Sequence, residues 1–179
     1  SNCQQVNDAW IYAEYDGYSG YILAEYLEPS DGRVTFSAMM VTILYRIAGE
    51  PEVSGTSAFV DVPDGEFYTD PVIWATGNGI TTGLDSRHFA PGKSLTRQEL
   101  VTFLYRFAKY MGCDVNSRSD ALVDFVDTDS LSAYAVVPMK WAVGSGLISG
   151  MDATHLGARA LSNRAQLAVI LARLYIHVM

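Results

Sequence analysis

Two arginines stand where the chain could bind an anion. Arg97 directly follows Thr96, and Arg164 directly follows Asn163. Each pair precedes a run with helical apolar spacing, so both arginines are predicted to begin a helix. The first turn of a helix offers unbonded backbone N–H groups and the positive end of the helix dipole. A guanidinium there can hold a carboxylate through two hydrogen bonds. The pattern therefore indicates a site for a carboxylate-bearing ligand.

The same residues have a second interpretation that needs no ligand. Glu99 lies three positions after Thr96, which is the spacing of a capping box, in which the two side chains bond to each other's backbone N–H groups. Arg97 would then pair with a nearby acid. The spacing alone favours this interpretation, because capping boxes are common.

Two tryptophans and two aspartates are further candidates for ligand contact. Trp74 and Trp141 could offer flat faces to sugar rings, but each lies on a short amphipathic stretch, where packing in the core is favoured. Asp61 and Asp127 could touch a ligand, but their positions just before a helix or turn favour local capping.

The sequence lacks the usual metal and catalytic motifs. Asp124, Asp127 and Asp129 are close in sequence, but the calcium-loop pattern with its central glycine is missing. The three histidines are far apart and share no ligand spacing. No nucleophile–base pair, glycine-rich phosphate loop or zinc-enzyme motif occurs. We therefore predict a protein that is not an enzyme and that uses no cofactor or metal.

Composition narrows the class of protein. The chain has 179 residues, 49% of them hydrophobic and 18% charged, with a net charge of −8. The hydrophobic content predicts a folded chain. The negative net charge predicts an electrostatic field that repels nucleic acid. No apolar run has the length of a membrane span. Cys3 and Cys113 leave a single disulfide or two free thiols open. We expect a monomer that is a piece of a longer protein.

The sequence repeats itself with a nearly constant register. Phe59-Val60-Asp61-Val62 returns as Phe125-Val126-Asp127-Thr128, Trp74-Ala75 returns as Trp141-Ala142, and Arg97 returns as Arg164. Further upstream, Val41-Thr42-Ile43-Leu44-Tyr45-Arg46 resembles Val101-Thr102-Phe103-Leu104-Tyr105-Arg106. Such self-similarity predicts stacked units that share a core.

The repeats divide the chain into three predicted units, at 1–58, 59–119 and 120–179. Units two and three read as helix, loop and helix. Unit one has a helix at 37–48 but no equivalent of the first helix. In its place, aromatic runs around Asp16-Gly17 predict a β-hairpin at 10–27. The predicted fold is mainly α, with a short N-terminal hairpin.

At this point the sequence resembles the S-layer homology (SLH) modules of bacterial surface proteins, over residues 34–179. The motifs that carry the resemblance are Phe59-x-Asp61-Val62, Trp74-Ala75, Gly79-Ile80-x-x-Gly83, Phe89-x-Pro91 and Thr96-Arg97-Gln98-Glu99. The last of these is similar to the family's Thr-Arg-Ala-Glu signature. The resemblance implies a pseudo-threefold spindle of three units.

The resemblance also implies a function. The family anchors proteins to the Gram-positive wall by binding secondary cell-wall polysaccharide, often with pyruvate ketals, and its arginine is a principal ligand contact in grooves between units. For this chain it implies an extracellular, cell-wall location and upstream domains in the parent protein. The implied ligand-contacting set is Arg97, Arg164, Trp74, Trp141, Thr96, Glu99, Asp61 and Asp127.

The sequence departs from the family pattern at two of the three signatures. Phe36-Ser37 stands where Thr-Arg is expected, so one groove lacks its arginine, and Asn163 and Gln166 replace Thr and Glu around Arg164. At most two grooves are then expected to bind. The hairpin, in turn, resembles the end of a bacterial SH3-type domain, or it replaces the first helix of unit one.

Two functional hypotheses follow. The first is an anchor that holds an anionic wall polymer through Arg97 and Arg164, and it predicts that alanine at both positions abolishes wall binding without moving the melting temperature. The second is a structural or protein-interaction module whose glycan sites have decayed. The polymer's chemistry and the groove that is used stay open.

Overall fold

The computed structural model describes residues 2–5, 10–15, 18–23 and 37–178. Three β-strands come first among these residues: β1 (Asn2–Gln5), β2 (Trp10–Tyr15) and β3 (Tyr18–Leu23). Five α-helices follow, together with two short 3-10 helices between α3 and α4. The helices are α1 (Ser37–Ile47), α2 (Thr69–Gly77), α3 (Arg97–Tyr110), α4 (Val136–Gly144) and α5 (Arg164–His177). The described chain is mainly helical.

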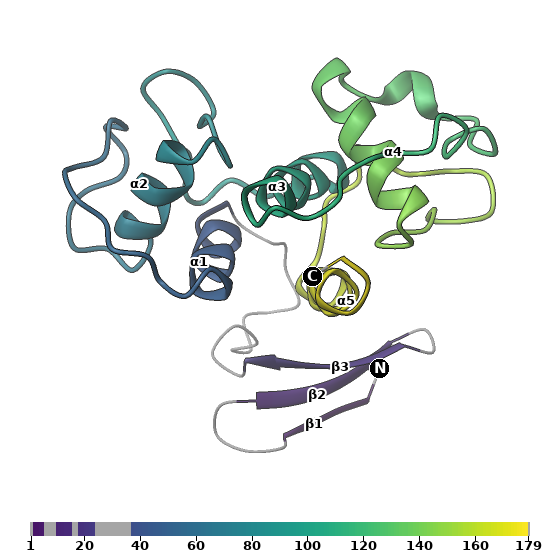
Figure 1. Ribbon diagram of the computed structural model, residues 1–179, viewed down its shortest axis with the longest axis horizontal. Helices are drawn as coiled ribbons and strands as arrows, with labels where there is room; N and C mark the ends of the chain where they lie inside the picture. The colour runs from purple at the N-terminus through teal and green to yellow at the C-terminus, as the bar shows by residue number, and fades with distance from the viewer. Residues whose placement is uncertain (1, 6–9, 16–17, 24–36, 179) are drawn as a thin grey trace.

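The three longest helices, α1, α3 and α5, lie around a common centre (Figure 1). Apolar residues at three- and four-residue spacing along these helices are buried, among them Leu44, Leu104 and Leu174, which are 0–1% exposed. Burying each such side chain contributes about 1.5–3 kcal/mol. The helix expected at 37–48 corresponds to α1, which spans Ser37–Ile47.

Each central helix has a partner on its outer side. α2 packs on α1, α4 packs on α3, and the sheet packs on α5 through β3 and β2 (Figure 1). The sheet thus stands to α5 as α2 stands to α1. The short helices come from the unit that follows the central helix they cover, so consecutive units are tied together by packing.

The sheet is antiparallel in the order β1-β2-β3. Trp10 is opposite Leu23 and Tyr15 is opposite Tyr18, so β2 and β3 pair along their whole length. These strands fall within the hairpin predicted at 10–27. Its residues 16–17 and 24–27 lie outside the described residues.

One cysteine side chain can be described in the structure. Cys113 is a free, half-buried thiol that packs against the core.

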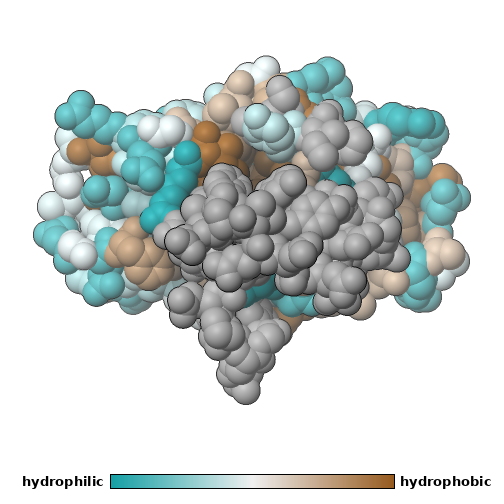
Figure 2. Space-filling view, turned by 90° about the horizontal axis from the view of Figure 1, so that it is seen from below, coloured by the Kyte–Doolittle hydropathy of each residue, from teal (hydrophilic) through white to brown (hydrophobic). Residues whose placement is uncertain are grey.

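Hydrophilic and hydrophobic residues are interspersed on both flanks of the face shown in Figure 2. Exposed apolar residues such as Val60 and Val126, at 63% and 69%, occupy repeat-equivalent positions. Scattered apolar residues of this kind are normal on a folded surface.

Candidate ligand-binding grooves

Two surface grooves of similar size open beside the central helices. Groove A has a volume of about 240 Å³ and lies between the start of α1, the loop 81–95 and α3. Groove B has a volume of about 230 Å³ and lies between the start of α3, the turn 148–151 and α5. Groove A is lined by Ser37, Thr81, Thr82, Gly83, Leu84, Phe89, Lys93, Leu95, Glu99, Thr102, Phe103, Arg106 and Tyr134. Groove B is lined by Arg97, Ile148, Ser149, Gly150, Met151, Gln166, Val169, Ile170 and Arg173.

The two grooves are built from equivalent positions. Every residue that lines groove B has its repeat equivalent in the lining of groove A, and Arg97 corresponds in this way to Ser37. The equivalence extends to backbone contacts. Arg106 donates from Nη1 to the carbonyl of Ile80 at 3.4 Å, and Arg173 donates in the same way to Leu147 at 3.2 Å.

The helix starts dock on the loops of the next unit. The backbone N–H groups of Arg97 and Gln98 donate to the carbonyls of Ala160 and Ala158, both at 2.9 Å. Ser37 N–H donates to Lys93 in the same way, at 3.0 Å. The N–H groups expected to be available for an anion are therefore already bonded within the protein. An anion at α3 would have to be held by side chains.

Asp61 and Asp127 hold these loops in shape. The Asp61 carboxylate accepts the N–H groups of Phe89 and Ala90, each at 2.8 Å. Asp127 accepts those of Leu156 and Gly157 at 2.8 and 2.9 Å. Burial alone would raise the pKa of Asp127, but these backbone hydrogen bonds outweigh it and lower the pKa. This geometry favours the local capping interpretation of both aspartates.

Arg97 crosses from α3 into the loop of the next unit. Its Nε donates to the carbonyl of Leu156 at 3.0 Å and its Nη2 to that of Ser149 at 2.7 Å. The residue is only 8% exposed. Burial lowers its pKa, and the charge of Asp127 partly offsets the shift. The guanidinium thus fixes the wall of groove B, and its other N–H groups have no partner among the described residues.

Arg164 lies against α1 rather than in either groove. Its Nη2 donates to Sδ of Met39 at 3.5 Å. By repeat equivalence, the loop facing Arg164 would come from about residues 21–35. Residues 24–35 of that stretch lie outside the described residues, so a groove at Arg164 is not described.

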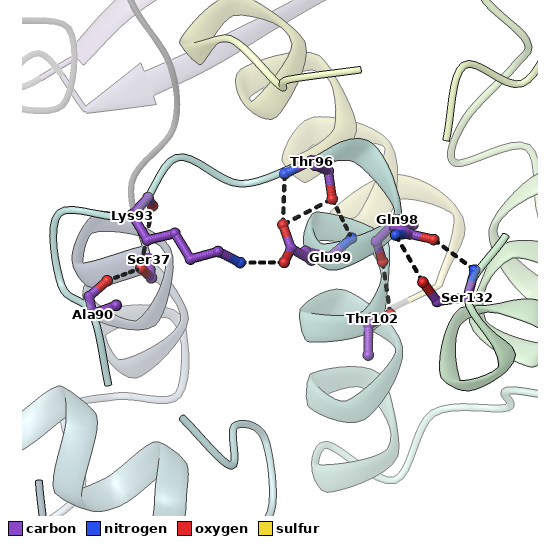
Figure 3. Close-up of polar contacts among 8 residues, drawn as sticks. All are labelled: Ser37, Ala90, Lys93, Thr96, Gln98, Glu99, Thr102 and Ser132. Carbon is purple, nitrogen blue, oxygen red and sulfur yellow. Dashed lines mark hydrogen bonds and ion pairs between the residues drawn. The ribbon is translucent and has the colours of Figure 1, made fainter. Parts of the chain in front are cut away.

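Both predicted capping boxes are present. Thr96 N–H donates to Oε2 of Glu99 at 2.9 Å, and Glu99 N–H donates back to the Thr96 hydroxyl at 3.4 Å. Asn163 and Gln166 form the same box at α5. In groove A the other oxygen of Glu99 accepts from Nζ of Lys93 (Figure 3). Burial would raise the pKa of Glu99, but the bonds from Lys93 and Thr96 lower it overall. Glu99 therefore lines groove A with an ionised carboxylate.

The tryptophans lie in the core, away from the lining of both grooves. Trp74 is 5% exposed and packs edge-on against Tyr45 and Tyr110, with ring centres 5.5 and 5.4 Å away. Trp141 is 1% exposed and packs against Tyr105 at 5.6 Å. This placement favours the core-packing interpretation.

Several groove residues were missed in the sequence. Arg46, Arg106 and Arg173 occupy the same position in the three repeats. This recurrence can be seen in the sequence, but it indicates a repeat and does not indicate a binding site. Lys93 and Tyr134 give no spacing signal, because they reach groove A from a loop and from the following unit. Burial and the nearby Glu99 carboxylate raise the pKa of Tyr134.

No group of three or more metal-binding side chains is found in the described part of the chain. Across the same residues, no helix combines the length and apolarity needed to cross a membrane.

Comparison with models of protein families gives a match. Residues 58–101, which cover α2 and the beginning of α3, match the model of the S-layer homology domain. No curated protein matches the chain. S-layer homology domains are in general non-catalytic modules that anchor proteins at the cell surface by binding secondary cell-wall polymers. The matched segment contains Lys93, Arg97 and Glu99.

Proposed function

We propose that this chain is a cell-surface anchoring module, and that groove B binds a carboxylate group of an anionic secondary cell-wall polysaccharide, including pyruvylated forms. The observation that carries the proposal is the charge of the groove. Two guanidinium groups, from Arg97 and Arg173, line it together with the neutral amide of Gln166, and the described lining includes no acidic side chain.

This local charge runs against the rest of the molecule. The chain carries a net charge of −8, so an acidic polymer is repelled by the average surface and attracted only where arginines are concentrated. Asp127, whose charge acts on Arg97, has its carboxylate bonded to two backbone N–H groups on the loop. A carboxylate in groove B would meet donors that are held in place before it arrives. Fixed donors of this kind reduce the entropy cost of binding.

The size of the groove suits part of a polymer rather than a long segment. Its volume of about 230 Å³ is just below the usual range for small-molecule sites. One acidic sugar substituent would fit, with the remaining chain running over the surface. Each charge-assisted hydrogen bond would contribute about 1.5–3 kcal/mol before the costs of association.

The same proposal includes the architecture. The repeated helix starts, loops and grooves support three tandem units, at 1–58, 59–119 and 120–179, arranged as a pseudo-threefold spindle. The position of the sheet on α5 supports the view that the strands replace the first helix of unit one.

The proposal is tested by titrating a methyl glycoside that carries a pyruvate ketal into the chain by calorimetry. Arg173→Met is the test variant, and Arg106→Met is its matched control, because both arginines donate to an equivalent backbone carbonyl. We expect Arg173→Met to weaken binding at least about tenfold, the loss of one hydrogen bond to a charged group, and Arg106→Met to leave it unchanged. No binding by the wild type, or equal effects of the two variants, would contradict groove B as the site.

A further inference from the structure

Groove A carries hydroxyl groups where groove B carries aliphatic side chains. Thr81 and Thr102 line groove A, and their repeat equivalents in groove B are Ile148 and Val169. A hydroxyl group can both donate and accept a hydrogen bond. Groove A can therefore exchange hydrogen bonds with a ligand at positions where groove B offers only apolar contact.

The charged groups of groove A also differ from those of groove B. Ser37 stands where Arg97 brings a guanidinium to groove B, and the Ser37 hydroxyl donates to the carbonyl of Ala90 at 2.6 Å. Lys93 forms an ion pair with Glu99 (Figure 3). Groove A therefore lacks the arginine at the helix start that favours a carboxylate in groove B. Its charged groups can instead bond to the hydroxyls of an uncharged ligand, because a carboxylate accepts and an ammonium donates.

An aromatic ring from the following unit forms part of groove A. Tyr134 lies in the second of the two 3-10 helices (Ala133–Ala135) and is 50% exposed. Burial and the Glu99 carboxylate both raise the pKa of its hydroxyl, so the ring lies near the charged wall of the groove. An exposed tyrosine offers a flat apolar face together with a polar tip. Groove A thus combines an aromatic surface with hydrogen-bonding groups.

Two hydrogen bonds from α3 hold the segment that carries Tyr134. Gln98 Oε1 accepts the backbone N–H of Ser132 at 3.0 Å, and Gln98 Nε2 donates to the Ser132 hydroxyl at 3.2 Å (Figure 3). Gln98 is only 7% exposed, so these bonds fix the backbone two residues before Tyr134. The repeat equivalents of Gln98 are Ala38 and Ala165, and alanine cannot form this contact at the other two helix starts.

We propose that groove A is a second carbohydrate site, which takes one uncharged pyranose unit of the wall polysaccharide with its C–H face against Tyr134. A pyranose ring has an apolar C–H face and a rim of hydroxyl groups, which match an aromatic surface beside mixed donors and acceptors. The volume of about 240 Å³, just below the usual range for small-molecule sites, suits a single ring. Gln98 acts through Ser132 as a positioning residue for Tyr134. That this sugar belongs to the wall polysaccharide rests on the proposed function, whereas its binding to groove A can be measured separately.

The chain offers matched variants for the test. Tyr134→Leu removes the flat ring from an exposed side chain, and Tyr134→Phe keeps the ring without the hydroxyl. Phe67→Leu is the control, because Phe67 is the repeat equivalent of Tyr134, is 64% exposed and lies outside the lining of groove A. Gln98→Ala removes both bonds to Ser132 and introduces the residue that α1 and α5 carry at this position.

The experiment is an NMR titration of isotope-labelled chain with the methyl glycosides of glucose, mannose and N-acetylglucosamine. We expect at least one of these uncharged probes to shift the amide signals of the groove A loop at 81–84. Tyr134→Leu and Gln98→Ala should weaken that binding about three- to tenfold, the range expected for the loss of an aromatic contact. Tyr134→Phe should bind more tightly than Tyr134→Leu, and Phe67→Leu should bind like the wild type.

A parallel titration with the pyruvate-ketal glycoside separates this inference from the proposed function. It should shift the amide signals of the groove B turn at 148–151, and Tyr134→Leu should not weaken it. If the pyruvate-ketal glycoside fails to bind while an uncharged probe binds in groove A, the proposed function of groove B is contradicted and the second site stands.

Several results would overturn the second site itself. These are no binding of any of the three uncharged probes, amide shifts confined to groove B, and equal losses of affinity in Tyr134→Leu and Phe67→Leu. Unchanged affinity in Gln98→Ala would overturn the positioning role of Gln98.

Discussion

Replacing Arg97 by alanine should destabilise the protein, and the size of the effect can be worked out from its two hydrogen bonds. Arg97 donates to the carbonyls of Leu156 and Ser149 at 3.0 and 2.7 Å and is 8% exposed. Hydrogen bonds to charged groups contribute about 1.5–3 kcal/mol each. Part of this sum is offset, because alanine removes the cost of burying a guanidinium.

We therefore expect Arg97→Ala to lower the free energy of unfolding by about 2–4 kcal/mol. For a chain of this length, each kcal/mol corresponds to about 2–4 °C, so the melting temperature should fall by about 5–15 °C. The measurement is thermal unfolding followed by circular dichroism, with urea unfolding as a second readout. This geometry reverses the expectation from sequence that alanine here leaves the melting temperature unchanged.

Arg159 provides a matched control. It also donates from Nε to a backbone carbonyl, that of Ser130 at 2.8 Å, but it is exposed. Arg159→Ala should change the free energy of unfolding by about 0.5 kcal/mol or less. If Arg97→Ala melts within about 2 °C of Arg159→Ala, the two buried hydrogen bonds do not stabilise the fold, and the reasoning is refuted.

Further predictions concern the loops and the response to acid. Ala90 and its repeat equivalent Gly157 have φ angles of 60° and 61°, in the left-handed region that favours glycine. In urea unfolding, Ala90→Gly should therefore stabilise the protein by about 0.5–1 kcal/mol, and Gly157→Ala should destabilise it by about 1–2 kcal/mol. Effects of the opposite sign would contradict the argument from backbone conformation. Asp127→Ala leaves two backbone N–H groups without their acceptor and should cost about 2–4 kcal/mol by the same method, whereas a cost below about 1 kcal/mol would count against the loop-clamping role. The pKa of Glu99 is lowered from its ordinary value of 4.5, so its contribution to stability is present above that pH and is lost as the pH falls through the lowered pKa. The acid-induced loss should therefore be smaller in Glu99→Gln than in the wild type, and identical pH profiles would contradict it.

The helix starts could be predicted from the sequence, because they depend on local chemistry. The Thr96–Glu99 and Asn163–Gln166 boxes require only residues three positions apart, and apolar spacing then gives the direction of the buried face. The repeat register likewise predicts that Asp61 and Asp127 have matching positions. The capping-box spacing and the repeat register both agree with the structure, because neither depends on how the units pack.

The groove chemistry could not be predicted in the same way, because it depends on contacts between units. Arg97 reaches carbonyls in the loop of the following unit, far along the chain, and no local pattern indicates that contact. Lys93 and Glu99 pair across the end of a loop, outside any helical spacing. At Ser37 the sequence pattern indicates a lost arginine, but it does not reveal that Lys93 brings another cation into the same groove.

The most direct test of the anchoring function is co-sedimentation with Gram-positive wall sacculi, before and after hydrofluoric acid removes their secondary polymers. Wild-type chain and Arg173→Met, which removes a guanidinium from groove B, should be compared on both preparations. The account predicts that the wild type is retained only on untreated walls and that Arg173→Met is retained there at least about tenfold more weakly. Wild-type chain that stays in solution with untreated walls, or that binds stripped walls equally well, would contradict it.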